Sequence, residues 1–301
     1  MPLRKPPGVR QYANPAAFRA AVDARLRRLA RQQGVEAFVF RRRAALERLM
    51  VRLTKVAPGC WAFKGGLALE TRLGEHARPS ADLDADHAHG TAAARADIQR
   101  AVTEDLGDYF TFVITGAEEL GEGGTSLAVR YELECSVGGV RFEPLQVDVS
   151  NAPPDPWDAE PVRRPGLLAD VGLGPVDVLV VPLERQIAEK IHAYTRQYNG
   201  RTTRAKDLVD FVLIRNFEPV RAGPLQEAIE RTFAHRRTHP VPDRLPAPPA
   251  ELAVAYRREA QVVGITTSLE EAHRLAAQWL DPVLADTAVG TWDPSTAQWG
   301  R

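Results

Sequence analysis

The sequence contains little cysteine, little lysine and no long apolar run. Its 301 residues include two cysteines, Cys60 and Cys135, in apolar, strand-like contexts where they need not pair, which fits a reducing cytosol. No apolar stretch approaches the roughly 20 residues that span a bilayer, and the N-terminus has no apolar signal core. We therefore expect a cytoplasmic protein, and we exclude membrane-spanning and disulfide-framed secreted classes.

Several catalytic signatures are also missing. His87 and His89 are two residues apart, but no second pair of ligands follows at the spacing of a zinc site. The chain has no G-x-S-x-G nucleophile turn and no Walker A loop. These absences argue against a zinc enzyme, a serine hydrolase of that type and a P-loop NTPase.

Charge is balanced overall but unevenly distributed. The chain has 39 basic and 39 acidic residues, yet residues 1–55 carry fourteen Lys or Arg against three Asp or Glu. Such asymmetry indicates either a polyanionic partner, RNA here, or a solvated helical face in an arginine-rich protein. If the basic end binds RNA, raising the salt concentration should weaken binding steeply.

The chain has only five lysines but thirty-four arginines, and the lysines are unevenly distributed along it. Three of them, Lys64, Lys190 and Lys206, lie within segments that carry other signs of a phosphate site. A compact ammonium reaches a crowded triphosphate as a point charge, where the wider guanidinium fork fits less readily. This placement supports nucleotide binding.

The segment from Phe63 to Asp86 carries the strongest signal. Asp82 and Asp84 are two residues apart, so in a strand they project to the same side, where two carboxylates can share a Mg²⁺ ion. Ahead of them, Gly65 and Gly66 let the backbone approach a phosphate closely, and a helix opening near Leu67 would add its N-terminal amides. This order is typical of the front half of a nucleotidyltransferase site.

Five blocks follow one another along the chain: Lys64-Gly65-Gly66, Arg78 with Ser80-Ala81-Asp82-Leu83-Asp84, Val147-Asp148-Val149, Glu189-Lys190-Ile191-His192-Ala193, and Arg204-Ala205-Lys206-Asp207-Leu208-Val209-Asp210-Phe211. In this order they resemble the nucleotidyltransferase-type toxins of the AbiEii/AbiGii group, including the MenT-like toxins, within the DNA-polymerase-β-like superfamily. The resemblance covers about residues 60–215, and Leu67 stands where the family usually has a small hydroxyl residue.

The resemblance implies roles for these residues. Asp82, Asp84 and Asp148 would seat two Mg²⁺ ions for attack of a hydroxyl on the α-phosphorus of an NTP. Lys190 would neutralise the β- and γ-phosphates, and Ser80 would donate to the triphosphate or brace its loop. Arg204 or Lys206 would contact phosphate or RNA, and Asp207 would orient Lys190 or contact the base. Lys64, Gly65 and Gly66 complete the expected nucleotide-binding set, whereas Asp86 is a weaker candidate at the mouth of the strand.

The pattern predicts an α+β protein with a polymerase-β-like mixed sheet, preceded by N-terminal helices and followed by a mainly helical C-terminal half. We place a soft domain boundary after residue 155, so that residues 1–155 form the sheet core and residues 156–301 complete the nucleotide site. The expected helices are 15–33, 35–56, 68–73, 92–106, a helix from 183 that ends at Asn199-Gly200, 206–215, 222–235, 249–263 and 268–286. The expected strands are 60–63, 83–85, 109–115, 125–137, 140–150 and 178–181, and the last dozen residues are expected to fray.

The predicted function is that of a Mg²⁺-dependent toxin that transfers NMP from an NTP to an RNA acceptor, by resemblance the 3′ end of tRNA. A cognate antitoxin is implied by the family. Two alternatives stay open: transfer to a protein or small molecule, and a non-catalytic NTP-binding module that regulates a neighbouring protein. Three carboxylates in metal-binding positions favour the enzyme over the module.

Overall fold

The chain folds into two compact units in the computed structural model, which describes residues 12–122, 125–151, 158–196 and 204–300. Unit 1 comprises Met1–Arg72 and Pro79–Val181, and unit 2 comprises Leu73–Arg78 and Pro182–Arg301. The boundary that the sequence suggests after residue 155 stays a prediction, and the structure keeps the strands between residues 160 and 180 in unit 1. Among the helices described, none combines the length and apolarity needed to cross a membrane.

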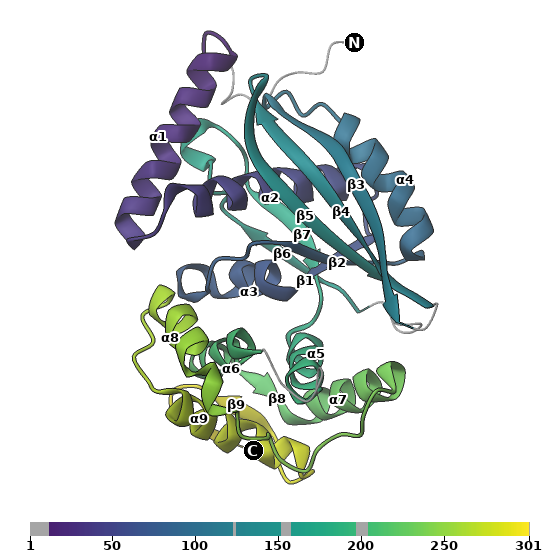
Figure 1. Ribbon diagram of the computed structural model, residues 1–301, viewed down its shortest axis with the longest axis vertical. Coiled ribbons are helices and arrows are strands. Elements are labelled where there is room, and N and C mark those ends of the chain that lie inside the picture. Colours follow the sequence, from purple (N-terminus) through teal and green to yellow (C-terminus); the bar gives the residue numbers. More distant parts are fainter. Residues whose placement is uncertain (1–11, 123–124, 152–157, 197–203, 301) are drawn as a thin grey trace. The chain divides into compact units, whose positions relative to one another are not determined.

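Unit 1 is built on a seven-stranded mixed sheet (Figure 1), which confirms the expected α+β class. The strand order is β3-β4-β5-β2-β1-β7-β6, in which β2 lies parallel to β5 and antiparallel to β1, and β1 lies parallel to β7. The strands are β1 (Trp61–Lys64), β2 (Leu83–His87), β3 (Phe110–Glu122), β4 (Thr125–Val137), β5 (Val140–Asn151), β6 (Glu160–Arg164) and β7 (Val176–Val180).

Two N-terminal helices precede the sheet, as expected. The side chain of Asn14 caps α1 (Pro15–Gln33) by accepting a hydrogen bond from the Ala17 amide at 2.9 Å, and Gly34 ends the helix at a positive φ of 65°. One stripe of α1 (Phe18, Val22, Leu26, Ala30) is buried against α2 (Ala37–Val56) and the core. The remaining helices of unit 1 are α3 (Gly65–Leu73) and α4 (Gly90–Thr103), and η3 (Ala169–Val171) is a short 3-10 turn.

The core of unit 1 lies on the sheet face covered by α2 and α4 (Figure 1). Residues of alternating position, such as Leu133 in β4 and Leu145 and Val147 in β5, point into this core, because successive side chains of a strand face opposite sides. Their sequence neighbours, including Glu132 and Gln146, therefore face the other side. That second face carries the polar groups described below.

The sequence underestimated the strand content of unit 1. β3 continues to Glu122 where a strand ending at residue 115 was expected, because its glutamate-rich second half still pairs with β4 across two register shifts. β6 was not predicted at all, since Pro161 argues against a strand. It forms because β6 is the edge strand, where a proline is tolerated.

The other correction in unit 1 concerns α3. This helix begins at Gly65 and not at residue 68, so the glycine pair forms the first residues of the helix.

Unit 2 is mainly helical, as expected for this part of the chain. It contains α5 (Leu183–Thr195), α6 (Ala205–Phe217), α7 (Ala222–Arg236), α8 (Ala253–Val262), α9 (Leu269–Leu284), the 3-10 turns η2 (Gly74–His76) and η4 (Ala250–Leu252), and the strands β8 (Val220–Arg221), β9 (Thr291–Asp293) and β10 (Gln298–Gly300). The helix expected from residue 249 divides into η4 and α8. The helix end expected at Asn199-Gly200 lies outside the described residues.

The C-terminal residues do not fray, and that prediction was wrong. β9 and β10 form a hairpin that pairs with β8. Two indole groups anchor it: Trp292 Nε1 donates to the Arg215 carbonyl at 2.7 Å, and Trp299 Nε1 donates to the Trp279 carbonyl at 2.9 Å. Trp292 is 1% exposed, so the hairpin closes over the helices through a buried aromatic cluster.

A series of hydrogen bonds between histidine and threonine side chains, a relay, connects α5 to the segment after α7. His192 Nε2 lies 2.8 Å from Thr238 Oγ1, and Thr238 Oγ1 lies 2.9 Å from His239 Nδ1. His239 Nε2 in turn lies 2.7 Å from Thr195 Oγ1, whose hydroxyl donates to the Ile191 carbonyl at 2.8 Å. Because the Thr195 hydroxyl donates onward, it accepts from His239 Nε2, so His239 Nδ1 accepts from the Thr238 hydroxyl and the His239 ring is neutral. Thr238 Oγ1 then accepts from His192 Nε2.

The burial of His192 at one end of this relay predicts acid sensitivity. Burial, with smaller contributions from His239 and nearby arginines, lowers the pKa of His192 to about 4. The unfolded chain takes up a proton near pH 6.5 and the folded chain does not, so stability is complete above pH 6.5 and falls as the pH drops toward 4. We expect a loss of about 2 kcal/mol between pH 8 and pH 5, measured by urea unfolding. The loss should be smaller in His192→Gln and unchanged in His235→Gln, whose histidine is exposed; equal losses in all three proteins would contradict the assignment.

Candidate active site

Four charged side chains form a row across four neighbouring strands of unit 1. In the observed register, Lys64 of β1 pairs with Asp84 of β2, Asp84 pairs with Asp148 of β5, and Asp148 pairs with Arg130 of β4. Paired residues of adjacent strands share one face of the sheet, so two carboxylates lie side by side between two cations. The sequence predicted Asp84 and Asp148 as partners in one site, and the sheet brings them together.

Asp148 is held by an arginine that the sequence did not single out. Arg130 Nε donates to Asp148 Oδ1 at 2.8 Å, and Arg130 Nη2 donates to Asp148 Oδ2 at 2.7 Å. With its amide oxygen turned toward the guanidinium, Gln146 accepts from the same two nitrogens at 3.2 Å. This bidentate pair fixes the direction of the Asp148 carboxylate and neutralises part of its charge.

The glycine turn brings the start of α3 against the second aspartate. Gly65 has a φ of +67°, and a Cβ atom added there would overlap an Asp84 carboxylate oxygen. Glycine is therefore required at position 65 for two reasons: the backbone is left-handed there, and the Asp84 carboxylate occupies the space of a Cβ atom. The Asp84 carboxylate lies beside the N-terminal end of α3, where the helix dipole favours negative charge.

Replacing Gly65 by alanine tests this packing. The methyl group would push the Asp84 carboxylate aside, so we expect Gly65→Ala to lose nucleotidyl transfer and about 1–3 kcal/mol of stability. Gly34→Ala is the matched control, because Gly34 has a similar φ of 65° with nothing within 4 Å of the added atom. Activity should be retained in Gly34→Ala, and equal activity in the two variants would refute the proposed contact.

Lys64 contacts two polar side chains on the same face. Its Nζ lies 2.7 Å from Asp86 Oδ1 and 2.7 Å from Ser150 Oγ, and Ser150 Oγ donates to Asp86 Oδ1 at 2.8 Å. Asp86 is fully buried, so the three groups hold the ammonium in one place beside Asp84. The phosphate-binding role expected for Lys64 stays a prediction, as does any role of Asp86 in the reaction.

Ser80 and Asp82 lie in the approach to β2. Ser80 Oγ donates to the Asp82 carbonyl at 2.9 Å, and the Ser80 amide donates to Glu70 Oε2 at 3.2 Å. The hydroxyl thus braces the loop in this structure, which is one of the two roles considered for it. Asp82 is half-buried and precedes the first residue of β2.

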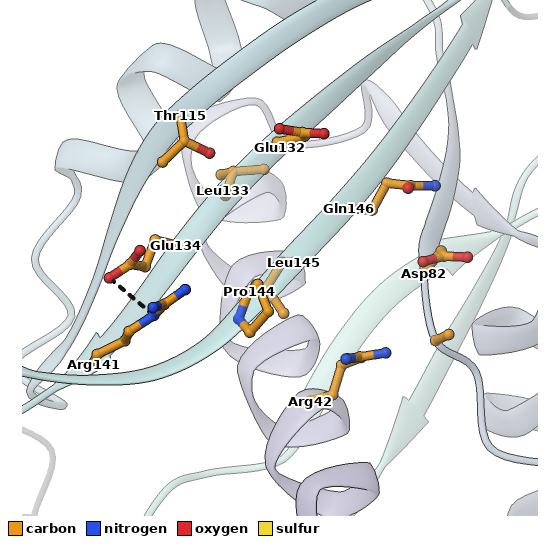
Figure 2. A pocket seen from close by; sticks show the side chains of 11 residues that line it. Arg42, Asp82, Thr115, Glu132, Leu133, Glu134, Arg141, Pro144, Leu145 and Gln146 are labelled. Atoms are coloured by element: carbon orange, nitrogen blue, oxygen red, sulfur yellow. Dashed lines mark ion pairs between the residues drawn. The ribbon is translucent and has the colours of Figure 1, made fainter.

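A shallow hollow opens next to Asp82. It has a volume of about 400 Å³ and is shown in Figure 2. Asp82 lies at one side of it and Gln146, Glu132 and Thr115 lie along β5, β4 and β3, with Arg42 reaching in from α2. The carboxylate row therefore has a polar space beside it on the side of β4 and β5.

The expected metal ligands are of the chemical type that binds a divalent cation, but their side chains are not gathered around one point. Carboxylate oxygens are the ligands that Mg²⁺ prefers, and Asp84 and Asp148 are register partners with Asp82 two residues away. Within the described residues, however, no three His, Cys, Asp or Glu side chains gather as a metal site. The Arg130 pair directs Asp148, so the set could hold a cation once Asp148 exchanges part of that pair for the ion.

Unit 2 contains a second cluster that includes Lys190 and Asp207. Lys190 Nζ lies 2.7 Å from Asp210 Oδ2 and 3.4 Å from Asp207 Oδ1. Arg78 binds the same Asp210 carboxylate through two hydrogen bonds of 2.8 and 2.9 Å. Burial alone would lower the pKa of Lys190, but Asp210 and Asp207 raise it above its usual value, so the ammonium stays charged.

The remaining predicted residues of unit 2 are more open. Arg204 Nε lies 4.0 Å from Asp207 Oδ2, and Lys206 is exposed on α6. Asp207 contacts Lys190, which is one of the two roles considered for it; a contact to a base is untested.

Sequence reasoning missed Asp210 and Arg130 as parts of these clusters. Asp210 could have been found from its spacing, because residues three apart on a helix share one face with Asp207. Arg130 could not have been identified from the sequence, because its pairing with Asp148 depends on the register between β4 and β5.

Comparisons with known proteins identify the family of the chain. Residues 48–279 match the family model described as nucleotidyl transferase AbiEii toxin, type IV TA system. The fold is similar to that of MenT4, a nucleotidyltransferase toxin from Mycobacterium tuberculosis H37Rv, with a TM-score of 0.53 and 16% identity over 87% of this chain and 98% of that chain. No curated protein matches the chain significantly. Because the family model matches most of the chain, the protein belongs to the AbiEii family of nucleotidyltransferase toxins.

Proposed function

We propose that this nucleotidyltransferase transfers NMP from an NTP to the 3′ end of an RNA, a tRNA in particular, in the cytoplasm. The observation that carries the proposal is the pairing of Asp84 with Asp148 on neighbouring parallel strands, beside Asp82 and the glycine start of α3. In the reaction, the acceptor hydroxyl forms a bond to the α-phosphorus, and the bond to pyrophosphate breaks. Blocking the 3′ end of tRNA in this way would prevent aminoacylation.

Each residue has a proposed task in that reaction. Asp82 and Asp84 would hold Mg²⁺, two ions with the help of Asp148, and the metal would supply positive charge to the attacking and leaving oxygens. Gly65 and Gly66 would bring the start of α3 close to the phosphates. Asp148, oriented by Arg130, would lie toward the acceptor hydroxyl.

Further contacts to the nucleotide are proposed for the remaining predicted residues. Lys64 and Lys190 would offer charge to the triphosphate, and Arg204 or Lys206 would contact phosphate or RNA. Asp207 and Asp210 keep Lys190 charged and oriented. Ser80 would act through the loop that it braces.

We expect the basic N-terminal region to contribute less to RNA binding than its composition suggests. Most of the arginines of α1 and α2 are committed to contacts within unit 1: Arg19 to three carbonyls of β4 and β5, Arg25 and Arg28 to Asp170, Arg41 to Glu143, Arg43 to Glu70, and Arg48 and Arg52 to Asp108. Most of the excess positive charge of this region therefore makes contacts that hold unit 1 together.

Transfer of label tests the proposal. Purified protein is incubated with Mg²⁺, total tRNA and each α-³²P-NTP in turn, beside Asp82→Ala. Label on tRNA from one NTP, lost in Asp82→Ala, is the expected result and identifies the base and the acceptor together. Label on protein or on a small molecule would assign a different acceptor to the same site. The absence of Mg²⁺-dependent pyrophosphate release with every acceptor would reject the proposal in favour of a non-catalytic module.

The family also implies a cognate antitoxin. Type IV systems are named in the family description, and we propose that an antitoxin encoded nearby counteracts this enzyme. Growth arrest on expression of the protein, relieved by co-expression of the neighbouring gene, is the expected result. Arrest that persists with every neighbouring gene would contradict the proposal.

A further inference from the structure

Arg42 differs from the other arginines of its helix. It lies in the run Arg41-Arg42-Arg43, where Arg41 pairs with Glu143 at 3.1 Å and Arg43 pairs with the fully buried Glu70. Among the described residues Arg42 forms no ion pair, although its charge acts on Glu143, which Arg41 binds. Its Nε, like those of Arg41 and Arg43, is buried without a hydrogen bond, and its guanidinium lies 5.9 Å from the centre of the Phe38 ring. A buried guanidinium nitrogen without a partner costs free energy unless a ligand satisfies it.

The position of Arg42 connects this donor to the carboxylate row. Arg42 lines the hollow of about 400 Å³ that also contains Asp82, Gln146 and Glu132 (Figure 2). This volume lies within the range of small-ligand sites and suits a single nucleotide. An arginine at one wall offers a planar fork that matches a phosphate group.

The strand order indicates which substrate enters the hollow. The glycine start of α3 follows β1, whereas most of the hollow is lined from β3, β4 and β5, with Ala81 and Asp82 at its near wall. In the order β4-β5-β2-β1, most of the hollow therefore lies on the β5 side of the Asp84–Asp148 pair and the glycine start on the β1 side. The proposed function places the triphosphate at the glycine side. The hollow is then on the side of Asp148, where the attacking hydroxyl belongs.

We propose that the hollow binds the 3′-terminal nucleotide of the acceptor RNA, with Arg42 on the last phosphodiester group. The proposal rests on the proposed function for the identity of the acceptor as RNA. Glu132, Gln146 and Thr115 line the space with hydrogen-bonding groups, of which a carboxylate and an amide are suited to the edge of an unpaired base. Arg42 is thus a residue for positioning the acceptor, and it makes no contact with the NTP.

The test measures RNA binding without catalysis. A short single-stranded RNA with a fluorescent 5′ end is titrated by anisotropy in EDTA and without NTP, using the full chain. Arg42→Ala should weaken binding about tenfold, because hydrogen bonds from a charged donor to a phosphate are lost. Arg31→Ala is the control, since Arg31 is an exposed arginine of α1 that does not line the hollow, and it should change the dissociation constant less than twofold.

A second RNA locates the contact. In this RNA the last phosphodiester is replaced by a neutral methylphosphonate, which removes the charge that Arg42 would bind. We expect the replacement to weaken binding to the wild-type protein about as much as Arg42→Ala does, and to have no further effect on Arg42→Ala. Additive losses, or equal losses in Arg42→Ala and Arg31→Ala, would overturn the proposal.

The outcomes for the two proposals are separable. If labelled NMP never reaches RNA but the methylphosphonate effect depends on Arg42, the hollow binds RNA and the proposed reaction is wrong. If NMP does reach RNA, Arg42→Ala should raise the KM for the acceptor and leave the KM for the NTP unchanged. A raised KM for the NTP alone would overturn the assignment of the hollow to the acceptor. Thermal unfolding of Arg42→Ala checks that the variant is folded.

Discussion

Asp84→Asn is expected to lower the rate of nucleotidyl transfer by about a thousandfold or more. The bound metal ion stabilises the charge of the transition state by several kcal/mol, and the variant loses one of the ligands proposed to hold that ion. Asparagine has nearly the same shape, so the contact with Gly65 is preserved while the negative charge is removed. The rate is measured in single turnover with saturating tRNA and α-labelled NTP. In Mg²⁺ titrations of both proteins, the variant should need a higher Mg²⁺ concentration to reach half of its maximal rate, because its affinity for the ion is lower.

The matched control is Asp177→Asn in β7. The Asp177 side chain is 60% exposed and lies 3.5 Å from Arg163, away from the carboxylate row. Its activity should stay within twofold of the wild type. Asp84→Asn that keeps a tenth of the activity or more, with an unchanged unfolding curve, would show that Asp84 does not ligate the catalytic metal.

The largest expected effect on stability comes from Asp108→Asn. Asp108 is fully buried in the segment between α4 and β3, where it accepts from Arg48 Nε at 2.7 Å and from Arg52 Nη2 at 2.7 Å. Burial alone would raise the pKa of Asp108, but Arg52 and Arg48 lower it below its usual value, so the carboxylate is charged at neutral pH. Removing this charge leaves two buried arginines without compensation. We expect a loss of about 3–5 kcal/mol in urea unfolding.

Asp170→Asn is a control with the same local chemistry and a different environment. Asp170 also contacts two arginines, Arg25 at 2.9 Å and Arg28 at 2.8 Å, but its side chain is 49% exposed. Exposed ion pairs are screened by water, so we expect less than about 1 kcal/mol. Similar losses for Asp108→Asn and Asp170→Asn would mean that burial does not determine the strength of these arginine pairs.

The sequence predicted well those elements whose signals are local. The stripe of Phe18, Val22 and Leu26 and the cap residues at both ends defined α1 at its observed bounds. The spacing of Asp82 and Asp84, together with the order of the blocks, led to the family and to the mixed sheet. These signals lie within a few residues of one another and need no knowledge of distant contacts.

Features that depend on pairing between distant segments were not predictable. Arg130 was recognised as part of an alternating strand, but its bond to Asp148 depends on the register of β4 on β5. β6 contains Pro161 and becomes a strand only because β7 lies beside it. The C-terminal hairpin depends likewise on buried tryptophans that meet residues far away in the chain. The local sequence signals in these segments were weak or pointed the other way.

The short segment Leu73–Arg78 has a consequence for how the gene could be divided. It belongs to unit 2, although the rest of that unit begins at Pro182. A polypeptide of residues 182–301 alone would lack Arg78, which binds Asp210, and His76, whose ring stacks on Phe217 at 4.1 Å. A single recombination crossover therefore cannot exchange the second unit intact between related genes, because two separate stretches of coding sequence must travel together.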